Sequence, residues 1–318
     1  MVHTSARCIY YNKKRRKRFD MQRDVLLVGG DKRQYYMAKF LERAGFAISY
    51  FGAFFPESEG AVCKIKTAEK LKEHLEKKKY DAVILPTPAG EEYVSGTNYE
   101  LRTKELGDWL KGQKDTGIFG GKIPRFLQAT LEKDGKTVVD FMKQEEIARM
   151  NGRLTAENAV LEAVMISDTA VINSRSLVIG FGRCGEMLAL VLSGLGSEVS
   201  VVETAPEKKM RARTYGYKVA EPEDLSRYQF IFQTVPEKNM LNDKRLVTLL
   251  GTEENDNCVV MDISSEPDSI DTEFARKNGI MCVRCPGLPG KYTARSAGEL
   301  LGEFVRNCLT ENECGTSG

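Results

Sequence analysis

Apolar and polar positions follow one another along this chain in blocks that predict alternating strands and helices. Continuous apolar runs that end in glycine, DVLLVGG (24–30) and FAISYFG (46–52), are typical of strands buried in a parallel sheet. Between them, the stretch 33–45 places apolar residues at helical spacing and ends on Gly45. The alternation continues with a helix at 68–79 and strands at 80–88, 118–123 and 136–142.

A helix over about 155–168 leads into a second set of alternating elements. Its predicted strands are SLVIGFG (176–182), EVSVVE (198–203), FIFQTVP (230–236), CVVMDIS (258–264) and GIMCVRC (279–285), separated by helices at 184–196, 205–216 and 272–279. The pattern predicts an α/β protein with two doubly wound, parallel-sheet (Rossmann-like) domains and an inter-domain cleft. We expect a tail at 1–20, domains at 21–150 and 151–310, and a second tail at 311–318.

Composition fits this picture of two globular domains. The chain has 318 residues, of which 42% are hydrophobic and 29% charged. No apolar run approaches the roughly 18 residues that a membrane span needs, and no secretory segment is recognisable. Eight scattered cysteines favour a reducing cytoplasm. The CxxC at Cys282 and Cys285 is interpreted as structural, with no metal site, because it falls in a predicted strand and the chain has only His3 and His74.

The net charge of +2 conceals a basic N-terminus. Residues 1–20 hold seven of the 47 basic residues and one of the 45 acidic ones, so the rest of the chain is slightly acidic. The run KKRRKR (13–18) can be a nucleic-acid arm or a solvated, disordered tail ahead of a start at Met21. We favour the tail, and we expect neither nucleic-acid nor membrane binding.

The segment 180–185, GFGRCG, fits the dinucleotide-binding pattern G-x-G-x-x-G. It follows an apolar strand and opens an amphipathic helix, which is the context that the pattern requires. Gly180 would form the tight turn, Gly182 would admit the pyrophosphate, and Gly185 would allow close helix–strand packing. We therefore interpret 151–310 as an NAD(P)-binding domain and 21–150 as the substrate-side domain. The alternative is that the glycines serve only a sharp turn.

Other candidate cofactor contacts lie where predicted strands end. Glu203 ends the strand after the glycine turn, where a carboxylate binds ribose hydroxyls and favours NAD over NADP. In an open α/β sheet, ligands bind outside the carboxyl ends of the strands. The predicted cofactor-binding residues are Gly180, Phe181, Gly182, Arg183, Cys184, Gly185, Glu203, Thr234, Val235, Pro236, Asp262, Ser264, Gly287, Leu288 and Pro289. The last three belong to CPGLPG (285–290), which we expect to form a rigid loop beside the nicotinamide.

Histidine scarcity limits the chemistry. His3 lies in the tail and His74 in a charged helix, so neither follows a strand of the cofactor domain. Histidine acid–base catalysis of the kind used by many 2-hydroxy-acid dehydrogenases is therefore not expected. The catalytic proton acceptor is not identifiable from the sequence.

Five segments taken together resemble the A-subunit family of dipicolinate synthase. They are VGGDKRQ (28–34), VIGFGRCG (178–185), QTVP (233–236), MDISSEP (261–267) and PGLPGKYTARSAG (286–298). The resemblance implies NAD(P)-dependent oxidation of dihydrodipicolinate to dipicolinate (pyridine-2,6-dicarboxylate) in the cytoplasm of a sporulating mother cell. It also implies a flavoprotein-like second subunit, the B-subunit of dipicolinate synthase, as partner, and we expect a homo-oligomer. The family leans towards NADP, whereas Glu203 leans towards NAD.

A dicarboxylate substrate needs cationic or hydroxyl partners. Lys32 and Arg33 follow the first strand, and Thr87 follows the proline-broken strand at 80–88. We predict that these three residues bind the substrate, together with Lys291 and Arg295 from an opposite wall.

Two other functions stay open from the sequence. One is a different NAD(P)-dependent dehydrogenase, such as an amino-acid or opine-type enzyme. The other is a non-catalytic module that senses NADH and binds a partner.

Overall fold

The computed structural model describes residues 23–310, except 53–62, 97–100, 222–224, 251–257 and 265–268. The tails predicted at 1–20 and 311–318 lie outside the described residues. The chain divides into two compact units, one made of Met1–Ala148 with Ala294–Gly318, the other of Arg149–Thr293. The second unit therefore ends before residue 310, because the last helix belongs to the first unit.

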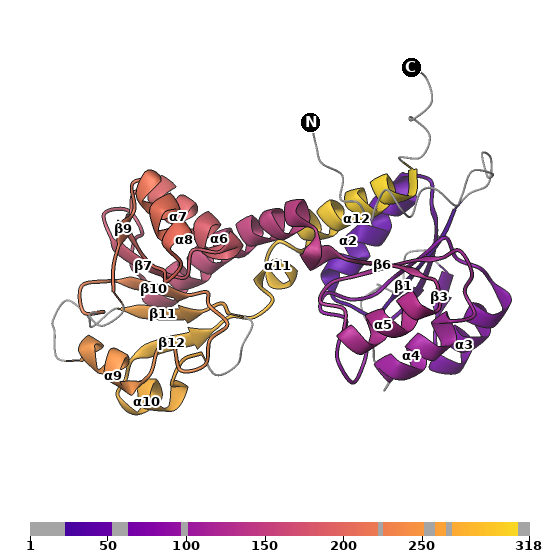
Figure 1. Cartoon of the computed structure of the whole chain (residues 1–318), viewed down its shortest axis with the longest axis horizontal. Coiled ribbons are helices and arrows are strands. Elements are labelled where there is room, and N and C mark those ends of the chain that lie inside the picture. Colours follow the sequence, from indigo (N-terminus) through magenta and orange to yellow (C-terminus); the bar gives the residue numbers. More distant parts are fainter. Residues whose placement is uncertain are drawn as a thin grey trace, which may run out of the picture. The chain divides into compact units, whose positions relative to one another are not determined.

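The first unit is built on a six-stranded parallel sheet in the order β3-β2-β1-β4-β5-β6 (Figure 1). Its strands are β1 (Asp24–Val28), β2 (Ala47–Phe51), β3 (Cys63–Ile65), β4 (Ala82–Ile84), β5 (Gly117–Gly120) and β6 (Thr137–Asp140). Its helices are α2 (Lys32–Arg43), α3 (Ala68–Lys77), α4 (Thr103–Leu110), α5 (Arg125–Lys133) and α12 (Ala294–Thr310).

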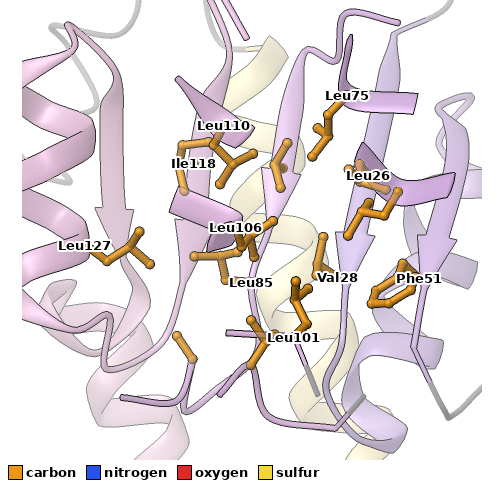
Figure 2. Packing of buried hydrophobic residues seen from close by; sticks show 14 of the residues in the cluster. Leu26, Val28, Phe51, Leu75, Leu85, Leu101, Leu106, Leu110, Ile118 and Leu127 are labelled. Atoms are coloured by element: carbon orange, nitrogen blue, oxygen red, sulfur yellow. The ribbon is translucent and has the colours of Figure 1, made fainter. Parts of the chain in front are cut away.

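Side-chain alternation along β1 divides the core of this unit in two. Val25 and Leu27 pack in a cluster with residues of α2 and α12. Leu26 and Val28 point to the other face of the sheet and pack with residues of α3, α4 and α5 (Figure 2). All four side chains are fully buried, which explains the continuous apolar run that predicts this strand.

Helix α12 lies along α2 at a short separation (Figure 1). Glycine permits the close approach: a Cβ on Gly298 would collide with the carbonyl oxygen of Arg33, and one on Gly302 would lie 2.9 Å from the Phe40 ring. Since 298 meets the first turn of α2 and 302 meets its third, the two helices run parallel. Their N-terminal ends therefore lie at the same end of the pair.

The second unit repeats the architecture, with the strand order β12-β11-β10-β7-β8-β9. Its strands are β7 (Arg175–Ile179), β8 (Glu198–Val202), β9 (Lys218–Val219), β10 (Phe230–Gln233), β11 (Val259–Asp262) and β12 (Met281–Arg284). Its helices are α7 (Arg183–Gly194), α8 (Pro206–Thr214), α9 (Asp243–Leu246), α10 (Thr272–Lys277) and α11 (Leu288–Lys291), and α6 (Glu145–Ser167) spans the boundary between the units.

Both sheets have the strand order of the doubly wound dinucleotide-binding fold, in which the first and fourth strands of the unit are neighbours. The predicted fold class is thus confirmed, while the cleft between the domains stays a prediction. Among the described residues, no helix combines the length and apolarity that a membrane crossing requires.

Several elements differ from the sequence prediction. Helix α6 begins at Glu145, about ten residues before the predicted start, and α4, α5, β3 and β9 were not predicted. The predicted loop at 285–290 is wrong in part, because residues 288–291 form a turn of helix, α11, with Gly287 in the left-handed region as its N-cap.

Candidate active site

The three glycines of the 180–185 turn have different surroundings. Gly180 has φ +95°, and a Cβ there would lie 2.5 Å from the Val235 side chain and 2.7 Å from the Thr234 hydroxyl. A Cβ on Gly185 would collide with the Gly180 carbonyl oxygen. A Cβ on Gly182 would have no neighbour within 4 Å. The first and third glycines are thus required for packing, whereas the second opens onto space.

Helix α7 starts directly after this open position. Gly182 is its N-cap, no side chain caps it, and Phe181 beside it is fully buried. The first N–H groups of a helix attract anions, so the helix end that adjoins Gly182 is suited to a phosphate. Burial raises the pKa of the neighbouring Cys184 thiol to about 12, so the thiol is protonated at neutral pH.

Glu203 stands at the end of β8 and binds the glycine turn. Its Oε2 accepts a hydrogen bond from the Phe181 N–H at 2.9 Å, and its Oε1 accepts from the N–H groups of Thr204 and Ala205 at 2.8 and 3.0 Å. Burial opposes ionisation, but these bonds and the nearby Lys208 hold the pKa of Glu203 below its usual value. Sequence reasoning placed the carboxylate correctly on the strand end but missed its bond to the turn.

The end of β10 adjoins the turn on the side opposite β8, and the end of β11 lies next to that of β10. The Thr234 hydroxyl donates to the Ile179 carbonyl at 2.8 Å, and Val235 and Pro236 follow it. Asp262 is 2% exposed and accepts from the Ser264 N–H at 2.9 Å, while its carbonyl oxygen accepts from the Cys285 N–H at 2.7 Å. These contacts place all the predicted strand ends at the carboxyl edge of one sheet.

The segment that contains Gly287, Leu288 and Pro289 is held by helix α6. Asn158, 1% exposed, donates through Nδ2 to the Leu288 carbonyl at 3.3 Å and to the Thr293 hydroxyl at 2.8 Å. Lys291 contacts the Glu162 carboxylate at 3.0 Å. The structure thus gives Lys291, a predicted substrate residue, a carboxylate partner from its own unit.

The CxxC pair lies in and after β12. Burial raises the pKa of Cys282 to about 12 and that of Cys285 to about 11, so both thiols stay protonated at neutral pH. Among the described residues, no group of three or more His, Cys, Asp and Glu side chains is placed to hold a metal ion.

In the first unit, Arg33 links the loops that follow β1 and β4. Its Nε and Nη2 contact the Asp31 carboxylate at 2.7–3.1 Å, and Nη2 also donates to the Thr87 carbonyl. Burial by itself would raise the pKa of Asp31. The hydrogen bonds and charge of Arg33 outweigh that effect and lower the pKa below its usual value. The side chain of Thr87 packs against Gly121, where a Cβ would collide with it. Lys32 is exposed at the first position of α2.

Arg295 lies in this same unit, which corrects the prediction of an opposite wall. It is the second residue of α12, and its guanidinium carbon lies 5.4 Å from the centre of the Tyr36 ring on α2. Because α2 and α12 are parallel, Arg33 and Arg295 both belong to the N-terminal ends of the pair. The structure therefore groups Lys32, Arg33, Thr87 and Arg295 in one unit, and places Lys291 in the other.

Comparison with known proteins shows which family the chain resembles. Residues 24–142 match the family model described as the N-terminal domain of the dipicolinate synthase A-subunit. The curated A-subunit of dipicolinate synthase from Bacillus subtilis (strain 168) is 25% identical over 299 residues, which cover 90% of this chain and 96% of the relative. The predicted resemblance to the A-subunit of dipicolinate synthase is confirmed.

Solved structures show the same fold. The crystal structure of the dipicolinate synthase A-subunit from Bacillus halodurans aligns with a TM-score of 0.76 and 22% identity over 91% of this chain and 98% of that one. The NAD-complexed D-isomer specific 2-hydroxyacid dehydrogenase of Lactobacillus delbrueckii ssp. bulgaricus aligns with a TM-score of 0.57 and 13% identity over 93% of this chain and 100% of that one.

Proposed function

We propose that this chain is the A-subunit of a dipicolinate synthase and oxidises dihydrodipicolinate to dipicolinate with a nicotinamide dinucleotide. The observation that carries the proposal is the 25% identity to the Bacillus subtilis protein, which extends over 90% of the chain and so through both units. By the same relationship we propose the B-subunit as partner and a role in sporulation, in the mother-cell cytoplasm.

The dinucleotide is proposed to bind at the carboxyl edge of the second sheet. When bound, it would accept the hydride that leaves the substrate ring. The chain's own contribution is the space at Gly182 and the adjoining N-terminal N–H groups of α7. A Cβ at 182 would meet no described residue within 4 Å other than its chain neighbours and its own helix.

Glu203 supports NAD as the preferred form. Its carboxylate is ionised at neutral pH, since its pKa is lowered, and it lies next to the Phe181 N–H of the turn. A negative charge there repels a 2′-phosphate and leaves oxygen lone pairs for ribose hydroxyls. Lys208, whose Nζ lies 3.7 Å from the Glu203 carboxylate, is the basic residue that could instead favour NADP by binding its 2′-phosphate.

The substrate carboxylates are proposed to bind the parallel N-terminal ends of α2 and α12. Arg33 has two donors on Nη1 that bond to no other described residue. Arg295 is exposed, with its guanidinium over the Tyr36 ring of the same helix as Arg33. The Asp31 carboxylate already caps α2 and pairs with Arg33, so Arg33 contributes hydrogen-bond donors on Nη1 and Arg295 contributes the added positive charge for a substrate carboxylate. Since aromatisation favours the oxidation, water can take the ring proton without a histidine.

The test is a direct assay of the full chain. A dihydrodipicolinate precursor is supplied with NAD or NADP, with and without the B-subunit, and absorbance of the aromatic product is followed. Product formation with NAD is expected. No product with either cofactor and the partner present would overturn the enzymatic proposal, and turnover of 2-oxo acids with amines instead would favour the opine-type alternative.

Arg295→Ala tests the substrate site. We expect its KM to rise at least tenfold, because a charge-assisted hydrogen bond contributes about 1.5–3 kcal/mol. Arg306→Ala is the matched control: Arg306 also lies on α12 and its guanidinium carbon is 5.4 Å from the centre of the Phe40 ring on α2. Equal effects of the two substitutions would remove Arg295 from the substrate site.

A further inference from the structure

Phe181, in the glycine turn, is held by opposite charges on the two sides of its backbone. Its N–H donates to the Glu203 carboxylate at the end of β8, at 2.9 Å. Its carbonyl oxygen accepts a hydrogen bond from Nη2 of Arg211, on α8, at 3.2 Å. The guanidinium carbon of Arg211 also lies 5.6 Å from the centre of the fully buried Phe181 ring. Arg211 thus contacts both the backbone and the side chain of this residue.

A buried carboxylate holds Arg211 in place. Glu186, in the first turn of α7, is 5% exposed, and its Oε2 lies 3.0 Å from Nη2 of Arg211. Arg149 of α6 is farther away, with Nη1 at 3.6 Å from Oε1. No described residue donates a hydrogen bond to Oε2, so charge holds the pair together while Nη2 donates to the Phe181 carbonyl. Because a buried charge without a partner is costly, Glu186 keeps the guanidinium at this position.

The bond to the Phe181 carbonyl fixes the direction of the next N–H group. The Phe181–Gly182 peptide is planar and trans, so its C=O and N–H point in opposite directions. With the carbonyl bound to Arg211, the Gly182 N–H points away from the guanidinium. No described residue accepts a hydrogen bond from this N–H, whereas the Phe181 N–H is used by Glu203. An oriented donor is therefore left at the turn.

We propose that Arg211 is a positioning residue for the dinucleotide: it holds the Phe181–Gly182 peptide so that the Gly182 N–H donates to the diphosphate. The inference rests on the proposed function, in which the dinucleotide binds at this turn. Arg211 also offsets the charge of Glu186, which would otherwise oppose an anion at the N-terminus of α7. The two effects are separable, because substitution of both charged residues removes the charge effect and leaves the peptide without its anchor.

The experiment is calorimetric titration of the full chain with NADH and NADPH, with thermal melts of each unliganded variant. Arg211→Met should weaken the binding of the preferred dinucleotide by about tenfold or more. Arg211→Lys keeps a charged donor for the Phe181 carbonyl and should bind more tightly than Arg211→Met. Arg213→Met is the matched control, since Arg213 is an exposed arginine in the same last turn of α8, and it should leave the affinity unchanged.

A double variant separates positioning from misfolding. Arg211→Met alone leaves the buried Glu186 carboxylate with Arg149 at 3.6 Å, which should lower the melting temperature. Replacement of both partners of a buried ion pair by apolar residues is close to neutral for stability. Arg211→Met/Glu186→Met should therefore melt near the wild type and still bind the dinucleotide about threefold or more weakly, because the Phe181 carbonyl has lost its donor.

The outcomes distinguish this role from the dinucleotide site itself. Wild-type affinity in Arg211→Met, equal affinity in Arg211→Lys and Arg211→Met, or full recovery in the double variant would overturn the positioning role and leave the site standing. An equal loss in Arg213→Met would also overturn it, because any positive charge on α8 would then suffice. If the wild type binds neither NADH nor NADPH, the proposed dinucleotide site fails and the inference fails with it.

Discussion

Gly182→Ala should separate cofactor binding from folding. Gly182 has φ −83°, and an added Cβ meets no atom within 4 Å, so the folded state accepts alanine without strain. Alanine is a poorer N-cap than glycine by about 0.5–1 kcal/mol. Alanine also has less conformational freedom than glycine in the unfolded chain, which stabilises the folded state by about 0.4–1 kcal/mol. The free energy of unfolding should therefore change by less than about 1 kcal/mol, or less than about 4 °C in Tm.

The same methyl group occupies the space proposed for the diphosphate. Forcing one extra carbon into a close-packed contact costs about 1–3 kcal/mol. This cost corresponds to a roughly five- to 150-fold loss of dinucleotide affinity. Isothermal calorimetry with NADH and NADPH measures it, alongside thermal melts of the unliganded chain.

Gly185→Ala is the contrasting variant. Its Cβ would collide with the Gly180 carbonyl oxygen, so the loss should appear in the melting temperature itself. A Gly182→Ala chain that melts like the wild type and binds both dinucleotides with unchanged affinity would refute the placement of the diphosphate over this turn.

Three further predictions concern stability and reactivity. The pKa of Glu203 is lowered from 4.5, so its ionised carboxylate stabilises the fold relative to Glu203→Gln above pH 4.5. This stabilisation should be lost as the pH falls through the folded-state pKa. Urea unfolding of both chains at pH 7 and pH 3 measures it. Gly298→Ala should lower the free energy of unfolding by about 1–3 kcal/mol. The control is Gly194→Ala in α7, where a Cβ meets nothing within 4 Å; it should leave the free energy of unfolding unchanged or raise it. If Gly194→Ala and Gly298→Ala lower that free energy equally, the packing argument for Gly298 is wrong. At pH 7.5, iodoacetamide should label the exposed Cys63 well before Cys282, whose pKa is about 12, and peptide mass spectrometry would show the reverse order if the burial argument is wrong.

The sequence predicted the strands well because their chemistry is local. Val25 to Val28 are buried on both faces of a sheet, so the apolar run itself reveals the strand. Helices α4 and α5 were missed because they are short, eight and nine residues, so each shows only about two turns of apolar spacing. The two-residue strand β9 is defined by its pairing with β8 and leaves almost no pattern of its own.

Site residues were predictable where a motif fixes the backbone, and not where a distant contact decides. The glycine turn and Glu203 follow from spacing along one βαβ unit. The partner of Lys291 is Glu162, more than a hundred positions away, and Arg295 joins the first unit because α12 returns to α2. Nothing in the local sequence around 291–295 signals either contact, although Gly298 and Gly302 mark the closely packed helix face.

The return of α12 makes the first unit depend on both ends of the described chain. Leu301, Val305 and Leu309 complete the cluster that covers Val25 and Leu27, yet the ribosome makes them only after the whole second unit. During synthesis, α2 must therefore wait with an uncovered apolar face until the last helix emerges. The second unit is contiguous and can form first, so the order of folding would run against the order of translation.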